Sequence, residues 1–148
     1  ARGRSLVASA QGVLEDRFAE LVAGSGVPYD AYREHTARLL ATLWEERRGI
    51  VSPQVLQEFL VNALRKLKTP LNLAQARDIV RSYGLWVTHD AGVAHILRAL
   101  ELMELTGYSF WDSQIIASAE VAGAEILYSE DMQDGRAIAG LVIRNPFN

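Results

Sequence analysis

Residues 108–135 constrain the fold more than any other part of the chain, because they predict a helix and a buried strand in direct succession. The helix is expected over residues 110–121, with Asp112 in its first turn. The strand is expected over residues 124–128, with Asp131 in the loop that follows it. In an open parallel sheet, ligands bind in the crevice at the carboxyl ends of the strands. The segment therefore predicts two carboxylates at one edge of a sheet, which suits a divalent metal ion.

Helical and strand-like patterns alternate along the rest of the chain, which has no repeats and no low-complexity tract. We predict helices over residues 31–47, 53–67, 72–82 and from His89 or Asp90 to residue 102, and strands over residues 50–51, 84–88 and 140–143. This alternation argues for an α/β fold, a three-layer α/β/α sandwich with a mainly parallel sheet. The 148 residues suit one domain, in which a turn-forming cluster at residues 24–28 separates a short N-terminal part.

The composition limits which sites the chain can build. It contains no cysteine, so disulfides and thiolate metal sites are excluded, whereas carboxylates can still hold a hard cation. The three histidines, His35, His89 and His95, lack metal-ligand spacing and are interpreted as structural residues. No apolar run approaches the ~18 residues that span a bilayer, and no signal-peptide pattern is present. We therefore expect a cytoplasmic protein with no membrane partner.

The formal net charge of −3 bears on nucleic-acid binding. A nucleic-acid binder usually carries a net basic face, so this charge argues mildly against tight binding that ignores sequence. It does not exclude a nuclease, because a carboxylate cluster lowers the net charge and a bound metal ion restores the local attraction to phosphate.

Glu58 lies on the helix that Ser52 and Pro53 are expected to begin, since serine is a favoured N-cap and proline a favoured first helical residue. Gln54 and Asn62 lie four residues before and after Glu58, so the three side chains form a polar stripe on an otherwise apolar helix. The stripe has two interpretations. It is the solvent-facing edge of an amphipathic helix, or it holds an acid near the core edge, where a carboxylate needs a pairing group or a metal ion.

Asp112 and Asp131 also have structural interpretations beside the functional one. Ser109 and Asp112 have the spacing of a capping box, and an acid in the first turn complements the helix dipole. Asp131 and Asp134 lie in a loop, where aspartate often serves only to form a turn. The position of Asp131 just past a buried strand favours a functional role, with Asp134 as a reserve ligand.

Four motifs carry a resemblance to a known family. They are S-P-Q-V-L-Q-E-F at residues 52–59, L-T-G-Y-S-F-W-D at residues 105–112, L-Y-S-E-D-M-Q-D-G at residues 127–135 and R-N-P-F at residues 144–147. Together they resemble the PIN-domain family, and within it the VapC-like ribonuclease toxins of bacterial toxin–antitoxin pairs. The resemblance covers the chain from about residue 31 onward. Its acids lie 54 and 19 positions apart (112 − 58 and 131 − 112), which is typical of the family.

The resemblance implies a parallel sheet between helices, and a cleavage of RNA phosphodiester bonds that depends on Mg²⁺ or Mn²⁺. Glu58, Asp112 and Asp131 would be the second, third and fourth family acids, and they would hold the metal ion as the catalytic residues. Ser129 and Asn62 would orient these ligands through hydrogen bonds. The resemblance also implies an RNA substrate, a small antitoxin partner and a homodimer.

The chain departs from the family at the first acid, because the hydrophobic strand that ends in Asp-Thr-Asn in the family is not found. The nearest candidate is the segment 5–14, in which Ser-Ala-Gln from Ser9 onward would replace that motif. Alternatively, residues 1–29 are not family-like, and residues 13–22 form a helix in place of the first strand. Three hypotheses therefore stay open. They are a metal-dependent endoribonuclease, with an intact or an impaired site, an inactive PIN scaffold that binds RNA or a protein, and a generic α/β domain.

Overall fold

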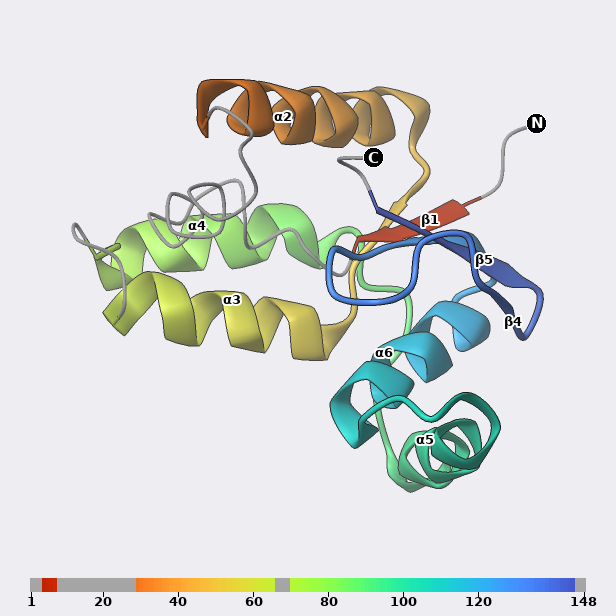
Figure 1. Ribbon diagram of the computed structural model, residues 1–148. Coiled ribbons are helices and arrows are strands. Elements are labelled where there is room, and N and C mark those ends of the chain that lie inside the picture. The colour runs from red at the N-terminus through yellow and green to blue at the C-terminus, as the bar shows by residue number, and fades with distance from the viewer. Residues whose placement is uncertain (1–3, 8–28, 66–69, 146–148) are drawn as a thin grey trace.

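The computed structural model describes residues 4–7, 29–65 and 70–145. Within them, five strands form one sheet in the order β2-β1-β3-β5-β4 (Figure 1). The strands are β1 (Arg4–Val7), β2 (Gly49–Ile50), β3 (Ala124–Tyr128), β4 (Ala137–Ile138) and β5 (Leu141–Arg144). β1 pairs in parallel with β2 and β3, β3 pairs in parallel with β5, and β4 runs antiparallel to β5. The fold is therefore mixed α/β, with a small mixed sheet.

The strand β1 lies between β2 and β3 although it comes first in the chain. Val7 is in register with Tyr128, so β1 and β3 end at the same edge of the sheet. β1 overlaps the start of the segment 5–14 that was the candidate for the first strand. Ser9 and the alternative helix over residues 13–22 lie outside the described residues.

Five helices accompany the sheet in the described residues, and local sequence signals fix several of their ends. They are α2 (Tyr29–Glu46), α3 (Pro53–Arg65), α4 (Leu73–Gly84), α5 (Val93–Thr106) and α6 (Phe110–Val121). The Ser52 hydroxyl accepts a hydrogen bond from Val55 N–H at the start of α3. Asn72 caps α4 through a reciprocal capping box with Gln75, and Gly107, at a φ of 77°, ends α5. None of the described helices is long and apolar enough to cross a membrane.

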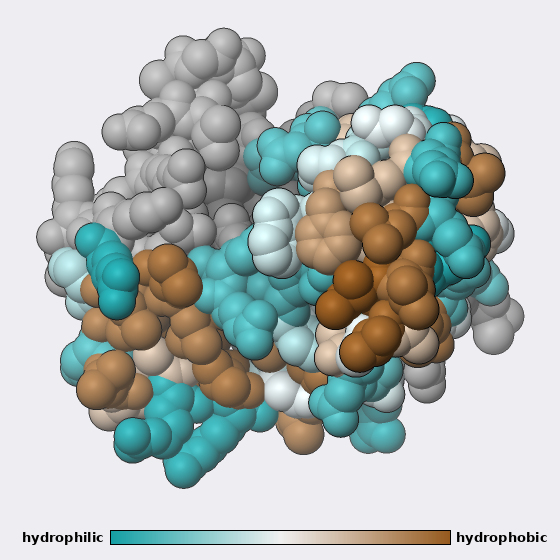
Figure 2. Space-filling view, turned by 90° about the horizontal axis from the view of Figure 1, so that it is seen from below, coloured by the Kyte–Doolittle hydropathy of each residue, from teal (hydrophilic) through white to brown (hydrophobic). Residues whose placement is uncertain are grey.

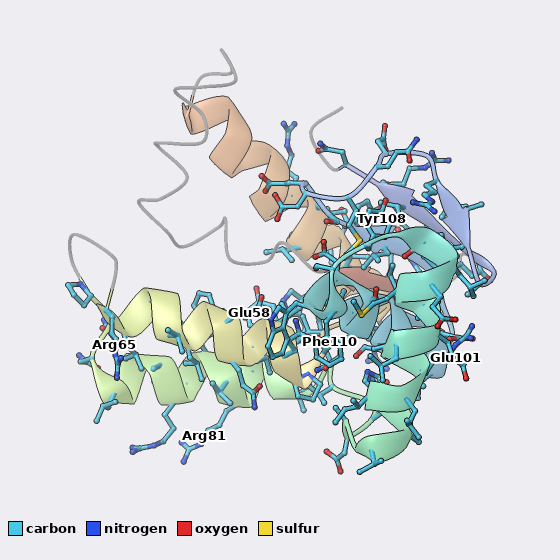
Figure 3. The ribbon with its side chains drawn as sticks, turned by 60° about the horizontal axis from the view of Figure 1, so that its bottom comes forward. Glu58, Arg65, Arg81, Glu101, Tyr108 and Phe110 are labelled. Atoms are coloured by element: carbon cyan, nitrogen blue, oxygen red, sulfur yellow. The ribbon has the colours of Figure 1, made fainter. Side chains whose placement is uncertain are left out.

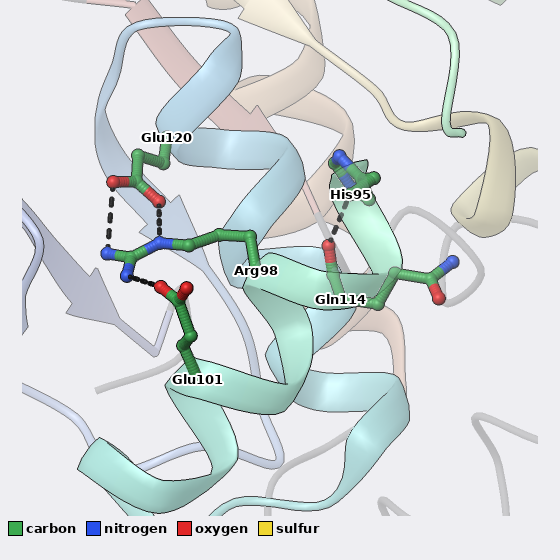
Figure 4. Close-up of polar contacts among 5 residues, drawn as sticks. All are labelled: His95, Arg98, Glu101, Gln114 and Glu120. Atoms are coloured by element: carbon green, nitrogen blue, oxygen red, sulfur yellow. Dashed lines mark hydrogen bonds and ion pairs between the residues drawn. The ribbon is translucent and has the colours of Figure 1, made fainter. Parts of the chain in front are cut away.

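Helix α6 packs against β3, and α5 packs against α6 below the sheet in Figure 1. Arg98 on α5 donates hydrogen bonds to both carboxylate oxygens of Glu120 on α6, at 2.9 and 3.1 Å (Figure 4). The buried His95 places its Nε2 atom 3.2 Å from the Gln114 carbonyl oxygen. These contacts fix α5 on α6, and for His95 they agree with the predicted structural role.

The strand predicted over residues 84–88 is wrong. Helix α4 runs through Gly84, and turns follow it. The N–H groups of Trp86 and Val87 donate to the carbonyl oxygens of Tyr83 and Gly84, at 2.9 and 3.1 Å. An N–H group that bonds within a turn cannot also join a sheet ladder. Trp86 therefore enters the core from a turn, while Leu85 before it is exposed.

Two further differences concern short-range backbone bonding. The helix predicted from His89 or Asp90 begins at Val93. The Gly92 carbonyl is the first that accepts helical hydrogen bonds, and it accepts them from the N–H groups of His95 and Ile96. The two-residue strand β4 was not predicted, and its antiparallel pairing with β5 is what makes the sheet mixed.

A tight contact between β2 and an aromatic cluster requires glycine at position 49. The buried Trp86 ring packs against Trp44 and Tyr83, with centroid distances of 4.7 and 5.2 Å. A Cβ atom at Gly49 would lie 2.6 Å from atoms of the Trp86 ring. Glycine therefore leaves the space that the ring occupies.

Gly49→Ala should destabilise the fold by about 1–3 kcal/mol, the usual cost of overpacking a core. Denaturant unfolding followed by tryptophan fluorescence measures the change. Gly84→Ala is the matched control, because nothing lies within 4 Å of its added Cβ atom. Unchanged stability in Gly49→Ala would show that the Trp86 contact does not require glycine.

Candidate functional site

Asp112 occupies the third position of α6, where the start of the helix holds its backbone in place. The Ser109 hydroxyl accepts a hydrogen bond from Asp112 N–H at 3.1 Å, so the predicted N-cap is confirmed. The carboxyl group is partly buried, and the helix dipole favours a negative charge at this end of the helix.

The electrostatic surroundings of Asp112 include Asp131. Burial raises the pKa of Asp112 above its usual range, the Ser109 side chain opposes this rise, and the negative charge of Asp131 adds to it. Like charges within electrostatic reach are unfavourable unless a cation joins them. Among the described residues, neither carboxylate forms an ion pair with lysine or arginine. A cation bound by the two acids would therefore be stabilised by both charges.

Hydrogen bonds hold the loop that carries Asp131. The buried Ser129 hydroxyl accepts from the N–H groups of Asp131 and Met132, each at 3.3 Å. Asp134 accepts a hydrogen bond from Asn145 N–H at 2.8 Å, which ties the loop to the end of β5. The contacts of Ser129 order the loop backbone, and a direct role in orienting metal ligands stays a prediction.

Tyr108 joins this loop to the start of α6, a role that sequence analysis did not identify. Its hydroxyl accepts a hydrogen bond from Gln133 N–H at 2.9 Å, and the Arg136 guanidinium lies 4.9 Å from its ring centroid. Because Tyr108 directly precedes the N-cap of α6, this bond brings the loop of Asp131 to the helix end that bears Asp112. A tyrosine before a helix cap carries no sequence signal for so distant a contact.

Gln54 links Glu58 on α3 to the start of α6. Its Nε2 atom donates to Glu58 Oε1 at 3.0 Å and to the Trp111 carbonyl oxygen at 3.3 Å. Figure 3 labels Glu58 on α3 and Phe110, the first residue of α6. Trp111 immediately precedes Asp112. The two hydrogen bonds of the Gln54 amide therefore connect the Glu58 carboxylate to the start of α6, next to Asp112.

The predicted polar stripe on α3 is more buried than a solvent-facing edge would be. Gln54 is 6% exposed and Glu58 is partly buried. The Oε1 atom of Gln54 is buried and has no hydrogen-bond partner in the part of the chain that the structure describes. A buried acceptor without a donor is costly, so a site at this position would gain from a ligand that donates to it. The side chain of Asn62, the third member of the stripe, lies outside the described residues.

The three predicted acids do not converge into one complete metal site. Within residues 4–7, 29–65 and 70–145, no group of three His, Cys, Asp or Glu side chains could hold a metal ion. The donor set nevertheless suits Mg²⁺ or Mn²⁺, because hard cations prefer oxygen ligands and Mg²⁺ commonly binds one or two carboxylates and keeps several waters. Asp112 and Asp131 would be its direct ligands, with Glu58 nearby.

No family model matches the chain, and no curated protein matches it. Membership of the PIN-domain family therefore stays a prediction from the four motifs. The function has to be inferred from the residues at the sheet edge.

Asp112 should titrate above the usual range of aspartate, because burial disfavours its ionised form. Asp131→Asn should lower the pKa of Asp112, since it removes the neighbouring negative charge. NMR titration of the side-chain carboxyl carbons measures both values, with Glu125→Gln on the exposed side of β3 as the control. An Asp112 pKa that does not respond to Asp131→Asn would contradict the proximity of the two acids.

Proposed function

We propose that the chain is a metal-dependent endoribonuclease of the PIN-domain toxin type, with the three-layer α/β/α arrangement of that family. The observation that supports this most is the pair Asp112 and Asp131. They come from a helix start and a strand end, they influence each other electrostatically, and among the described residues they have no basic partner. Uncompensated carboxylates at the carboxyl edge of a sheet are typical of functional sites.

In this proposal, Asp112 and Asp131 would bind Mg²⁺ or Mn²⁺, with Glu58 on α3 as a third carboxylate nearby. The bound ion would lower the pKa of a water molecule for attack on phosphorus and would neutralise charge on the phosphate. Gln54 holds the Glu58 carboxylate toward α6, and Ser129 holds the backbone of the loop that presents Asp131. Asn62 is proposed as a further orienting residue on α3.

The raised pKa of Asp112 predicts how metal binding at the proposed site depends on pH. A metal ion binds the ionised carboxylate and competes with a proton for it. Because burial and Asp131 raise the pKa of Asp112, protonation opposes metal binding at a higher pH than for an ordinary aspartate. Metal affinity should therefore rise as the pH rises through the Asp112 pKa.

The missing first acid lowers the metal affinity that we expect of the site. The family places that acid directly after the first strand, and β1 ends in register with β3, next to the loop that carries Asp131. In this chain the residues after β1 are Ala8, Ser9 and Ala10, which carry no charge. Three carboxylates attract a hard cation less than four do. We therefore propose an impaired site that needs millimolar Mn²⁺.

The alternative proposal is an inactive PIN scaffold that binds RNA or a protein partner. It is favoured by the missing first acid and by the absence of three converging ligands among the described residues. A small antitoxin would be a suitable partner, because an arginine between Asp112 and Asp131 would form charge-assisted hydrogen bonds with both. A cytoplasmic location and a homodimer are proposed on the resemblance alone.

The purified chain should cleave single-stranded RNA slowly in the presence of Mn²⁺, and chelation should stop the reaction. Asp112→Asn should abolish the cleavage, because it removes a proposed direct ligand. Glu125→Gln likewise replaces a carboxylate by its amide, but at an exposed residue of β3, and should leave the rate unchanged. No cleavage at millimolar Mn²⁺, or equal cleavage by Asp112→Asn, would rule out the nuclease as proposed.

Gln54→Leu should lower the rate of cleavage by roughly 10-fold to 100-fold, the usual effect of removing a residue that orients a metal ligand. The Mn²⁺ concentration for half-maximal rate should rise as well, because Glu58 loses the hydrogen bond from Gln54. The control is Gln57→Leu on the same helix, where the side chain is exposed. Equal kinetics in the two variants would mean that Gln54 only stabilises the fold.

A further inference from the structure

Trp111 presents most of its indole ring to solvent. It is 60% exposed, whereas Trp86 is buried and Trp44 packs against Trp86. Other apolar side chains are exposed as well, and Figure 2 shows such areas on the face on which α5 lies. Trp111 differs from them because it directly precedes Asp112, a proposed metal ligand, in the first turn of α6. Leaving so large an apolar ring in water is unfavourable, and a ligand of the acid site would cover it.

Two contacts hold Trp111 in place. The buried Gln54 donates a hydrogen bond from its side-chain amide to the Trp111 carbonyl oxygen at 3.3 Å. The rings of Trp111 and Phe110 meet edge to face, with their centroids 5.2 Å apart and an angle of 72° between their planes. An exposed ring that is held in this way loses little conformational freedom when a flat ligand stacks on it.

Arg136 supplies a positive charge from the loop that also carries Asp131. Its guanidinium lies 4.9 Å from the centroid of the Tyr108 ring, and the Tyr108 hydroxyl accepts a hydrogen bond from Gln133 N–H in the same loop. Among the described residues, Arg136 forms no ion pair with an acid. A guanidinium stacked on an aromatic ring keeps its N–H groups at its edge, where they can bind a phosphate with two hydrogen bonds. The Arg136 side chain is therefore oriented and available for a phosphate.

Trp111 and Arg136 are each joined directly to the segments that carry the two acids. Trp111 is adjacent to Asp112 in α6. Arg136 shares its loop with Asp131 and contacts Tyr108, which precedes the N-cap of α6. Proteins bind single-stranded nucleic acid by combining aromatic rings, on which bases stack, with positive groups that contact the phosphates. The same combination occurs here beside a pair of acids that would hold a metal ion.

These groups favour an unpaired nucleotide over a protein segment as the occupant of the site. An apolar protein side chain would cover Trp111, but it would leave Arg136 and a bound metal ion without an anionic partner. A nucleotide supplies both a flat ring and a phosphate. A base within a duplex has both faces covered by its neighbours, so only an unpaired, unstacked base offers a face to Trp111.

We propose that Trp111 stacks on an unpaired base of the substrate strand while Arg136 contacts a neighbouring phosphate, so that the site selects single-stranded RNA over paired RNA. Both are positioning residues, and the acids keep their proposed role in the chemistry. The inference rests on the proposed function, since it takes RNA as the ligand of the acid site. It has its own test, because binding and stacking can be measured without cleavage.

Fluorescence anisotropy of a short, labelled RNA without base pairs measures the binding. The Asp112→Asn chain with a chelator prevents metal-dependent cleavage and lowers the repulsion of phosphate. In this background, Trp111→Ala should raise the dissociation constant about 5-fold to 100-fold, the usual loss for one stacked base, and Trp111→Phe should keep most of the affinity. Val121→Ala is the matched control, since Val121 is 61% exposed at the other end of α6. No binding, or equal affinity of the Trp111→Ala and Val121→Ala variants, would overturn the proposal.

Tryptophan fluorescence separates stacking from a merely structural role of Trp111. The RNA should quench the emission of the chain, and Trp111→Phe should bind RNA with that quenching lost, although Trp44 and Trp86 remain. The same strand paired with its complement should bind more weakly, by about the factor lost in Trp111→Ala. Equal affinity for the paired strand, or quenching that persists in Trp111→Phe, would contradict the stacking.

The salt dependence of binding tests the phosphate contact. Arg136→Gln should reduce the slope of the logarithm of the binding constant against the logarithm of salt concentration by about 0.7, the value for one phosphate on a single strand. Arg81→Gln, at an exposed position of α4 that Figure 3 labels, is the control and should leave the slope unchanged. An unchanged slope in Arg136→Gln would overturn the role of Arg136.

The outcomes distinguish this inference from the proposed nuclease. Stacking on Trp111 without cleavage by the natural chain in Mn²⁺ would support the inference and contradict the nuclease. Cleavage by the natural chain, with RNA binding unchanged in Trp111→Ala, would overturn the inference and leave the nuclease in place.

Discussion

The parallel pairing of β1 with both β2 and β3 is the constraint on which the rest of the structure depends. Because Val7 and Tyr128 are in register, β1 and β3 end together, and the loop that carries Asp131 begins at this edge. Tyr108 then ties that loop to the start of α6 through its bond to Gln133 N–H. The same edge is held on the other side of β3 by β5, where Tyr128 is in register with Arg144.

In that arrangement the ionised form of Asp112 is disfavoured, and a bound cation would offset this cost. Asp112 is stabilised as a helix residue by Ser109 and by the dipole, yet burial and Asp131 make its ionised form costly. Proteins keep such unfavourable groups at functional sites, where binding compensates for them. The same logic applies to the buried Oε1 atom of Gln54, which has no donor within the described residues.

The sequence predicted best those elements whose ends are set by neighbouring residues. Helix α6 and strand β3 have the predicted bounds, because the Ser109 cap begins the helix and Gly123, at a φ of 70°, separates the two elements. The strand over residues 84–88 failed because turn hydrogen bonds used its N–H groups, which an apolar pattern does not reveal. The order of acids along the chain could be read directly. Their incomplete convergence could not, because it depends on three separate elements meeting in space.

Calorimetric titration of Mn²⁺ into the purified chain measures whether Asp112 and Asp131 together bind a divalent cation. One ion should bind per chain, and this binding should be lost in Asp131→Asn and retained in Glu125→Gln. Absence of binding by the natural chain, or equal binding by Asp131→Asn, would contradict the metal site.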